Sequence, residues 1–264
     1  MSDNIVEISN LTFGYDESTI ILDGVSLFIP QGKIVAIMGG SGSGKTTLLK
    51  LITKQYEAQS GTISVFDTDI STLSTSGILK MRKKIGVLFQ FGALFTDISV
   101  FDNIAFSLRE HTNLPSCIIK TIVDMKLQAV GLFGSANLFP NELSGGMSRR
   151  IALARSIALD PSLMLYDEPF TGLDPISLSI TANLIKELNA TLNQTSILVT
   201  HDIEASFKIA DYIYFLANGK IVASGTPIDI KNSHDPMVRQ FIHGEIDGPF
   251  AYRYNTKNKY AFCL

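Results

Sequence analysis

Short apolar segments alternate with amphipathic segments along most of the chain. Apolar runs bounded by turn-forming residues are typical of β-strands, and they occur at residues 5–8, 20–29, 34–38, 62–66, 85–89, 163–166, 197–199, 212–216 and 221–223. Apolar positions at helical spacing predict helices at residues 46–53, 144–159 and 176–192. Because strands and helices alternate in this way, we predict an α/β fold with a mostly parallel sheet.

Two regions depart from this alternation. The first two strands, 5–8 and 20–29, are joined by a turn-rich stretch, and they predict a small antiparallel β subdomain near the N-terminus. Between residues 100 and 132 the apolar spacing is helical on both sides of a break at Pro115. We therefore expect a helical subdomain, at about residues 97–159, inserted between strands of the main sheet.

The composition is that of an ordinary globular protein, with 45% hydrophobic and 18% charged residues. A net charge of −3 and the lack of a long basic stripe argue against a nucleic-acid partner. The two cysteines, Cys117 and Cys263, are far apart in the sequence and indicate neither a disulfide framework nor a metal cluster. With no signal-peptide pattern and no run of about 18 apolar residues, we expect a soluble, cytoplasmic protein.

A glycine-rich segment follows the apolar run at 34–38 and leads into a predicted helix. It consists of Gly39, Gly40, Ser41, Gly42, Ser43, Gly44, Lys45 and Thr46, followed by Thr47, and it matches the pattern G-x-x-x-x-G-K-[ST] at every fixed position. The glycines let backbone N–H groups point at nucleotide phosphates, and the helix N-terminus adds a favourable dipole. Lys45 provides a positive charge for the same phosphates, and the Thr46 hydroxyl is a ligand for Mg²⁺. In this strand–loop–helix context the segment predicts ATP binding, and a flexible glycine turn is the weaker interpretation.

Two carboxylates, Asp167 and Glu168, end the apolar strand predicted at 163–166. The carboxyl ends of parallel strands meet at one edge of the sheet, where the phosphate loop also lies. We therefore expect Asp167 to hold Mg²⁺ through water, and Glu168 to polarise the water that attacks the γ-phosphate. Without the phosphate loop, a solvated acidic turn would be the better interpretation.

Three single residues gain a role from this context. Gln90 follows the strand predicted at 85–89 and is placed to reach Mg²⁺ or water, and His201 follows the strand at 197–199 and is placed to touch the γ-phosphate. Tyr15 lies upstream of the loop, where its ring is suited to stacking on adenine. Taken alone, each residue type is more often structural. The expected catalytic residues are Glu168, His201, Lys45 and Gln90, and the expected metal ligands are Thr46, Gln90 and Asp167.

Ser144, Gly145 and Gly146 form a second expected anion site. Ser144 is a good helix N-cap, and the two glycines leave the N–H groups of the first helical turn open. One ATP does not need two such sites from a single copy of the chain. A head-to-tail dimer resolves this, because the phosphate loop of one copy then faces Ser144 of the other, with ATP between them.

Taken together and in this order, these residues resemble the nucleotide-binding subunits of ABC transporters, over almost the whole chain. The resemblance implies a P-loop NTPase core at residues 1–246, and a C-terminal extension at 247–264 that docks on a partner subunit. It adds Asp174, which matches the family's loop that reaches across the dimer. Two departures from the family pattern are Met147, where Gln is usual, and Thr171-Gly172, where Ser-Ala is commoner.

The segments 89–103, 108–111 and 143–150 resemble the ATPases of MCE-type lipid transporters, especially the Mla-type phospholipid system of Gram-negative envelopes. That resemblance implies a peripheral subunit on the cytoplasmic face of the inner membrane. Its partners would be a second copy of the chain, permease subunits, an MCE-domain protein and a small STAS-domain protein. An importer of amino acids or another small solute is the alternative.

Two further segments are candidates for partner surfaces. The apolar stretch 91–95 follows Gln90 and is expected to face a permease helix, although packing inside the helical subdomain is nearly as good an explanation. In the tail, Phe250, Tyr252 and Tyr254 alternate, so an extended chain would place them on one face, suited to docking on the neighbouring copy. A frayed terminus is the alternative.

Two other classes of ATPase are less consistent with the sequence. ABC-type ATPases that act on DNA or ribosomes have long coiled-coil insertions or two ATPase domains in one chain, and neither is present here. A regulatory ATP sensor without turnover would not need Glu168 and His201, which are both present.

Overall fold

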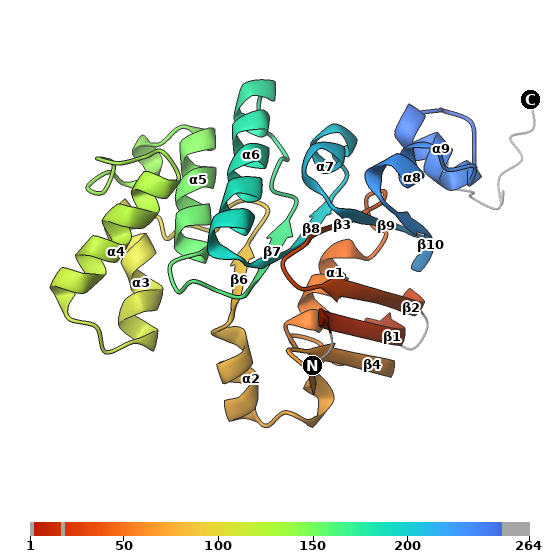
Figure 1. Cartoon of the computed structure of the whole chain (residues 1–264), viewed down its shortest axis with the longest axis horizontal. Helices are drawn as coiled ribbons and strands as arrows, with labels where there is room; N and C mark the ends of the chain where they lie inside the picture. Colours follow the sequence, from red (N-terminus) through yellow and green to blue (C-terminus); the bar gives the residue numbers. More distant parts are fainter. Residues whose placement is uncertain (1–2, 17–18, 250–264) are drawn as a thin grey trace, which may run out of the picture.

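The computed structural model describes residues 3–16 and 19–249, which form two β-sheets with helices around them (Figure 1). The α/β class expected from the sequence is confirmed. The expected docking of Phe250, Tyr252 and Tyr254, and the position of Cys263, lie outside the described residues.

The smaller sheet is antiparallel and comes from the N-terminal part of the chain. It contains β1 (Asn4–Gly14), β2 (Ile20–Pro30), β4 (Ser60–Val65) and β5 (Thr68–Asp69), in the order β2-β1-β4-β5. β1 is longer than the predicted run because alternate apolar residues continue into it, and Leu11 and Phe13 are buried. The N-terminal antiparallel subdomain expected from the sequence is therefore present.

The larger sheet has six strands in the order β10-β9-β3-β8-β7-β6. It contains β3 (Ile34–Met38), β6 (Ile85–Leu88), β7 (Leu163–Asp167), β8 (Thr195–Thr200), β9 (Tyr212–Ala217) and β10 (Lys220–Gly225). Pairing is parallel from β6 through to β9, and only the edge strand β10 is antiparallel, joined to β9 by a hairpin. The carboxyl ends of β3, β6, β7 and β8 thus meet at one edge, which is where the chain carries its glycine-rich loop and acidic residues.

Three helices form a block at one end of the molecule, on the left of Figure 1. They are α3 (Val100–His111), α4 (Ser116–Ala129) and α5 (Gly145–Ser156). All three lie within residues 97–159, where a helical subdomain was expected, and their buried apolar side chains pack in one core. α6 (Pro175–Leu192) lies next to this block, and α1 (Lys45–Ile52) packs between the two sheets.

Two hydrophobic cores meet at β3. Ala36 and Met38 belong to the core shared with the helical block, whereas Val35 and Ile37 belong to the core shared with α1 and the antiparallel sheet. Successive side chains of a strand point to opposite faces, so a strand between two cores must be apolar at every position. The uninterrupted apolar run of β3 is explained by this double burial, and it holds the start of the phosphate loop in a rigid place.

Several short helices are absent from the sequence-based prediction. They are α2 (Thr75–Arg82), α7 (Ile203–Ile209), α8 (Pro227–Lys231) and α9 (Pro236–His243), together with the 3-10 turns η1 (Ile70–Thr72) and η2 (Pro140–Glu142). With eight residues or fewer they show little helical periodicity, although capping residues such as Asp202, Thr226 and Asp235 do mark their starts. α1 has only eight residues too, and the glycine-rich loop before it marked its start. In the part of the chain that the model describes, no helix has the length and apolar character needed to cross a bilayer.

Candidate functional site

The phosphate loop connects β3 to α1 in a conformation that only glycine accepts at two of its positions. A Cβ on Gly39 would lie 2.1 Å from the backbone oxygen of Leu216, so the loop passes against β9 with no room for a side chain. Gly44, the residue before α1, has a φ of 101°. Within the loop, Ser43 Oγ is buried and has no hydrogen-bond partner among the described residues, as suits a hydroxyl next to an anion site.

Lys45 is buried at the centre of this loop. Its ammonium donates hydrogen bonds to the backbone oxygens of Gly39, at 3.0 Å, and Gly40, at 2.9 Å. It lies 3.7 Å from Glu168 Oε1. Burial lowers the pKa of Lys45 from its usual value, and the negative charges of Glu168 and Asp167 partly oppose that shift. A buried ammonium group next to the backbone N–H groups of a glycine-rich loop attracts phosphate strongly.

Asp167 and Thr46 form the predicted metal position. Thr46 Oγ1 donates to Asp167 Oδ1 over 2.8 Å, which joins the start of α1 to the end of β7. Burial raises the pKa of Asp167, and the bond from Thr46 acts in the opposite direction. Gln90 and Thr46 both line the cavity that contains Lys45. Together with Asp167 they offer hydroxyl, carboxylate and amide oxygens, which are the hard donors that Mg²⁺ prefers. These residues therefore fit Mg²⁺.

Glu168 and His201 form a close pair. His201 Nδ1 lies 2.8 Å from Glu168 Oε2, and the backbone N–H of His201 donates to the same oxygen at 3.4 Å. The Thr171 hydroxyl adds a third bond to that oxygen, also at 3.4 Å. Glu168 has a φ of 49°, which is unusual for a residue with a side chain, and its N–H is held by the backbone oxygen of Val199 at 2.8 Å. Such a strained, well-held carboxylate suits a functional residue.

Tyr15 lines the same cavity as Lys45, Glu168 and His201. Its hydroxyl is hydrogen-bonded to Thr47 Oγ1 at 2.9 Å, and its ring packs edge-on against Phe13 and Tyr56. The side chain is nevertheless 56% exposed. Tyr15 is thus fixed in place with its ring accessible, as stacking on a nucleotide base requires.

One cavity of about 530 Å³ brings most of the predicted residues together. It is lined by Tyr15, Gly40, Ser41, Gly42, Gly44, Lys45, Thr46, Thr47, Gln90, Glu168 and His201. Gly39, Ser43 and Asp167 support this wall from behind rather than line it. Two lining residues, Ile21 and Phe241, were missed by sequence reasoning because neither belongs to a recognisable motif.

The second predicted anion site does not take part in this cavity. Ser144, Gly145 and Gly146 begin α5, where Ser144 Oγ accepts a hydrogen bond from the N–H of Met147 at 3.3 Å. Asp174 caps α6 by accepting from the N–H groups of Ile176 and Ser177, both at 3.0 Å, and its hydrogen bonding to Ser177 lowers its pKa. None of these four predicted residues lines the cavity that contains Lys45.

Arg149 is a residue that sequence reasoning missed entirely. It is buried on α5, one turn after Ser144, and donates to the backbone oxygens of Phe89, Gln90 and Thr171. Burial lowers its pKa. Arg149 thus links the helix that starts at Ser144 to two loops that flank the cavity, one carrying Gln90 and the other following Glu168.

Comparisons with known proteins identify the family of the chain. Residues 22–171, more than half of the chain, match the family model described as ABC transporter. The intermembrane phospholipid transport system ATP-binding protein MlaF of Haemophilus influenzae is 54% identical over 98% of this chain and 97% of its own length. MlaF of Escherichia coli K12 is 48% identical over 99% of this chain and 97% of its own length.

A solved structure gives the same result for the fold. A dimeric ATP-binding cassette in a post-hydrolysis state, bound to ADP and Pi, is 29% identical and superposes with a TM-score of 0.76. The match covers 84% of this chain and 98% of that cassette. The chain therefore belongs to the ABC transporter family, as one of its ATPase subunits.

Proposed function

We propose that this chain binds and hydrolyses ATP with Mg²⁺ as a head-to-tail dimer and drives phospholipid transport between the inner and outer membranes of a Gram-negative envelope. The observation that carries the proposal is the cavity around Lys45, in which a phosphate loop faces the Glu168–His201 pair. The phospholipid part rests on the similarity to the two MlaF proteins.

The residues of the cavity divide the work of hydrolysis. Backbone N–H groups of the phosphate loop and the ammonium of Lys45 bind the phosphates, and Tyr15 holds the base. Glu168 polarises the attacking water, and His201, 2.8 Å away, orients Glu168 and contacts the γ-phosphate. When bound between Thr46, Asp167 and Gln90, Mg²⁺ would neutralise charge on the phosphates.

The dimer follows from the separation of the two anion sites. Ser144 and Gly145 present the open first turn of α5 on a part of the surface that the Lys45 cavity does not include. Asp174 is solvent-exposed at the start of α6. A second copy turned head to tail would bring its own Ser144 to the phosphates held by Lys45. The solved cassette with ADP and Pi, a protein of the same fold, is a dimer.

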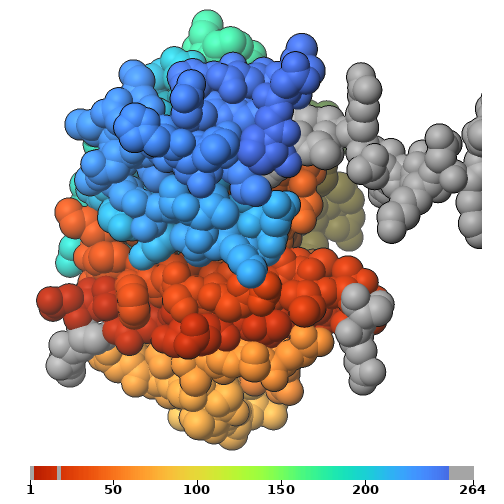
Figure 2. Space-filling model, turned by 90° about the vertical axis from the view of Figure 1, so that its right-hand side faces the viewer, coloured from red at the N-terminus to blue at the C-terminus, as the bar shows by residue number. Residues whose placement is uncertain are grey.

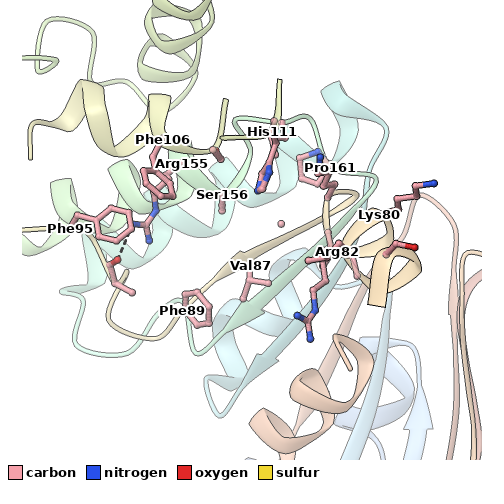
Figure 3. Close-up of a pocket in the computed structure, with 18 residues that line it drawn as sticks. Lys80, Arg82, Val87, Phe89, Phe95, Phe106, His111, Arg155, Ser156 and Pro161 are labelled. Atoms are coloured by element: carbon pink, nitrogen blue, oxygen red, sulfur yellow. Dashed lines mark hydrogen bonds between the residues drawn. The ribbon is translucent and has the colours of Figure 1, made fainter. Parts of the chain in front are cut away.

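A groove of about 790 Å³ supports docking on a permease (Figure 3). It lies between α2 and β6 on one side and the helical block on the other, and Phe89, Val87, Phe95 and Phe106 provide apolar walls. Phe95 is held there because Asn103 Oδ1 accepts from its N–H at 2.9 Å. Of the expected segment 91–95, Ala93 and Phe95 line the groove, whereas Phe91 is 86% exposed and does not. An amphipathic permease helix fits such a groove.

In this proposal the ATPase cassette spans residues 1–246, with its helical subdomain at about 97–159, and residues 247–264 form an extension that docks on a partner. The chain would lie on the cytoplasmic face of the inner membrane. There it would join permease subunits, an MCE-domain protein and a STAS-domain protein. A small-solute importer remains the second candidate only by family membership, and no observation in the site favours it.

The test uses the intact complex from the native host, purified through a tag on this chain and placed in liposomes. We expect fluorescent phospholipid to move in an ATP-dependent way with the wild-type chain, and movement to stop when the complex carries Glu168→Gln. A complex whose permease moves an amino acid, and no phospholipid, would refute the lipid assignment while leaving the ATPase intact.

A further inference from the structure

A second aromatic ring reaches the nucleotide cavity from the opposite end of the sequence. Phe241 lies on α9 and lines the same cavity as Lys45 and Tyr15. Figure 2 shows the last described helices, α8 and α9, in blue, and the N-terminal strands, in red, on one face of the molecule. Nothing in the phosphate-binding or hydrolytic arrangement described above uses Phe241.

Phe241 is held in place by both its helix and its neighbours. Its ring packs edge-on against Phe215 of β9, with centroids 5.1 Å apart and planes at 71°. α9 is anchored by the fully buried Val238, and Asp235 caps its first turn through bonds from two N–H groups. Gly244, with a φ of 63°, ends the helix immediately after this face. The ring is therefore a rigid part of the cavity wall.

The position of Phe215 explains how α9 comes close to the phosphate loop. Phe215 pairs with Met38 across β9 and β3, directly before Gly39. The next residue of β9, Leu216, is the one whose backbone oxygen closes off the Cβ position of Gly39. Because Phe241 packs edge-on against Phe215, its ring lies on the β9 side of the phosphate loop. Tyr15 lies at the end of β1 and is joined to the start of α1 by its hydrogen bond to Thr47.

The cavity has only three large apolar side chains among its described lining residues. They are Tyr15, Ile21 and Phe241, and all other lining residues are glycines, hydroxyl residues or groups that carry charge or an amide. Phosphates bind to N–H groups and cations, and they gain nothing from an aromatic ring. The flat, apolar part of a nucleotide is the base, so the aromatic part of the wall is suited to the base.

We propose that Phe241 is a second base-contacting aromatic residue, which makes α9 part of the nucleotide site. This inference rests on the proposed ATP binding, and it adds a residue that no motif of the chain contains. It predicts that nucleotide affinity depends on the C-terminal helix, through the base alone and independently of the triphosphate.

The experiment measures the affinity of the full chain for Mg-ATP and for Mg-tripolyphosphate, which lacks the base, by calorimetry. Phe241→Ala is expected to weaken ATP binding by about 3- to 10-fold, the usual worth of one aromatic contact, and to leave tripolyphosphate affinity unchanged. Phe241→Tyr keeps the ring and should bind ATP like the wild type. Met237→Ala is the matched control, since Met237 lies one turn earlier on α9, packs on the same core and does not line the cavity.

Each outcome separates the inference from the proposed function. Unchanged ATP affinity in Phe241→Ala would overturn the role of Phe241 and leave the ATPase assignment standing. Equal weakening of ATP and tripolyphosphate, or equal weakening in Met237→Ala, would show that α9 acts only on the shape of the loop, and would also overturn it. A wild-type chain that bound neither probe would refute the proposed function, and this inference with it.

Discussion

At the scale of single residues, Glu168 has the contacts expected of a catalytic carboxylate. Its carboxylate accepts from His201 and Thr171 and forms an ion pair with Lys45 at 3.7 Å, so three side chains fix its orientation. The positive φ of Glu168 keeps the side chain turned toward these partners at the end of β7. A residue held in this way is expected to act in the reaction rather than in stability.

Glu168→Gln therefore gives the first prediction. Turnover should fall by about 100-fold or more, because the amide cannot polarise water, while ATP binding stays within about threefold of the wild type. Steady-state ATPase assays and calorimetry measure both, and light scattering with ATP should detect a persistent dimer. Glu204→Gln makes the same chemical change on an exposed residue of α7 and should do nothing. Wild-type turnover in Glu168→Gln would refute the assignment.

Asp167 gives a prediction about pH. Its pKa is raised by burial, so the folded chain holds this proton more tightly than the unfolded chain does. The protonated carboxyl of Asp167 therefore stabilises the fold at low pH. This stabilisation is lost as the pH rises from the pKa of the unfolded chain through the higher pKa of the folded chain, so at neutral pH the charged carboxylate lowers the free energy of unfolding. Asp167→Asn keeps an oxygen that can accept from Thr46 and removes this titration.

We expect Asp167→Asn to abolish ATPase activity, yet to melt no lower than the wild type at neutral pH in the absence of nucleotide. Between about pH 4 and neutral, the melting temperature of Asp167→Asn should rise relative to that of the wild type, because only the wild type loses the contribution of this carboxyl. Parallel pH profiles for the two proteins would contradict this account.

At the scale of secondary-structure elements, α5 is the connection between the two halves of the proposed ATP site. Its first turn presents Ser144, and its next turn carries Arg149 to the loops that contain Gln90 and Thr171. Arg149 uses different guanidinium nitrogens for the two loops, which a single ammonium cannot do. Movement of α5 is therefore expected to move Gln90 and the residues after Glu168 with it.

Arg149→Met tests this connection. The change removes the donor to the half-buried carbonyl oxygens of Gln90 and Thr171, so the free energy of unfolding should fall by about 1–3 kcal/mol. We also expect kcat to fall while KM for ATP changes little, since Arg149 does not line the cavity. Arg150→Met is the control, because Arg150 donates to the backbone oxygen of Val130 inside the helical block and reaches neither of the two loops among the described residues. Arg149→Lys should restore stability in part, but not kcat.

Loss of ATP affinity with unchanged kcat in Arg149→Met would contradict a positioning role for Arg149.

At the scale of the whole molecule, the two anion sites expected from the sequence do not meet within one copy of the chain. Lys45 lies in the cavity, and Ser144 lies outside it. Such an arrangement makes a symmetric dimer with two equivalent ATP sites the natural assembly. Each ATP would then contact both copies. A substitution at Lys45 or Ser144 in one copy would therefore affect only one of the two bound nucleotides.

Mixing two inactive variants tests the head-to-tail dimer directly. Lys45→Ala and Ser144→Arg chains should each be inactive alone, but a mixed dimer has one site made of both intact halves. Random pairing makes half of the dimers mixed, so about a quarter of wild-type ATPase activity is the most that can return. Lys45→Ala mixed with Glu168→Gln damages the same half-site in both copies and should recover nothing. No recovery in the first mixture would contradict the proposed dimer.

Sequence reasoning anticipated the parts of the site that are local in the chain. The loop from Gly39 to Thr46 and the pair Asp167–Glu168 are short motifs whose chemistry depends on neighbouring residues, and the carboxyl ends of parallel strands must meet. The α/β class followed from strand and helix periods. The helices α7, α8 and α9 did not, because five to eight residues give few turns in which a period can show; α1 is equally short, but the glycine-rich loop before it marked its start.

What the sequence determined by itself is the local chemistry: a glycine-rich loop with a lysine before a helix, two carboxylates at a strand end, and a helix start with Ser144 and two glycines. Only the tertiary structure decided which of these share a cavity, since that depends on packing between segments far apart in the chain. It joined Lys45 to Glu168 and His201, left Ser144 and Asp174 apart from them, and brought in Arg149 and Phe241. Long-range packing places side chains that no local pattern marks, and this is why Phe241 and Arg149 could not be found from the sequence.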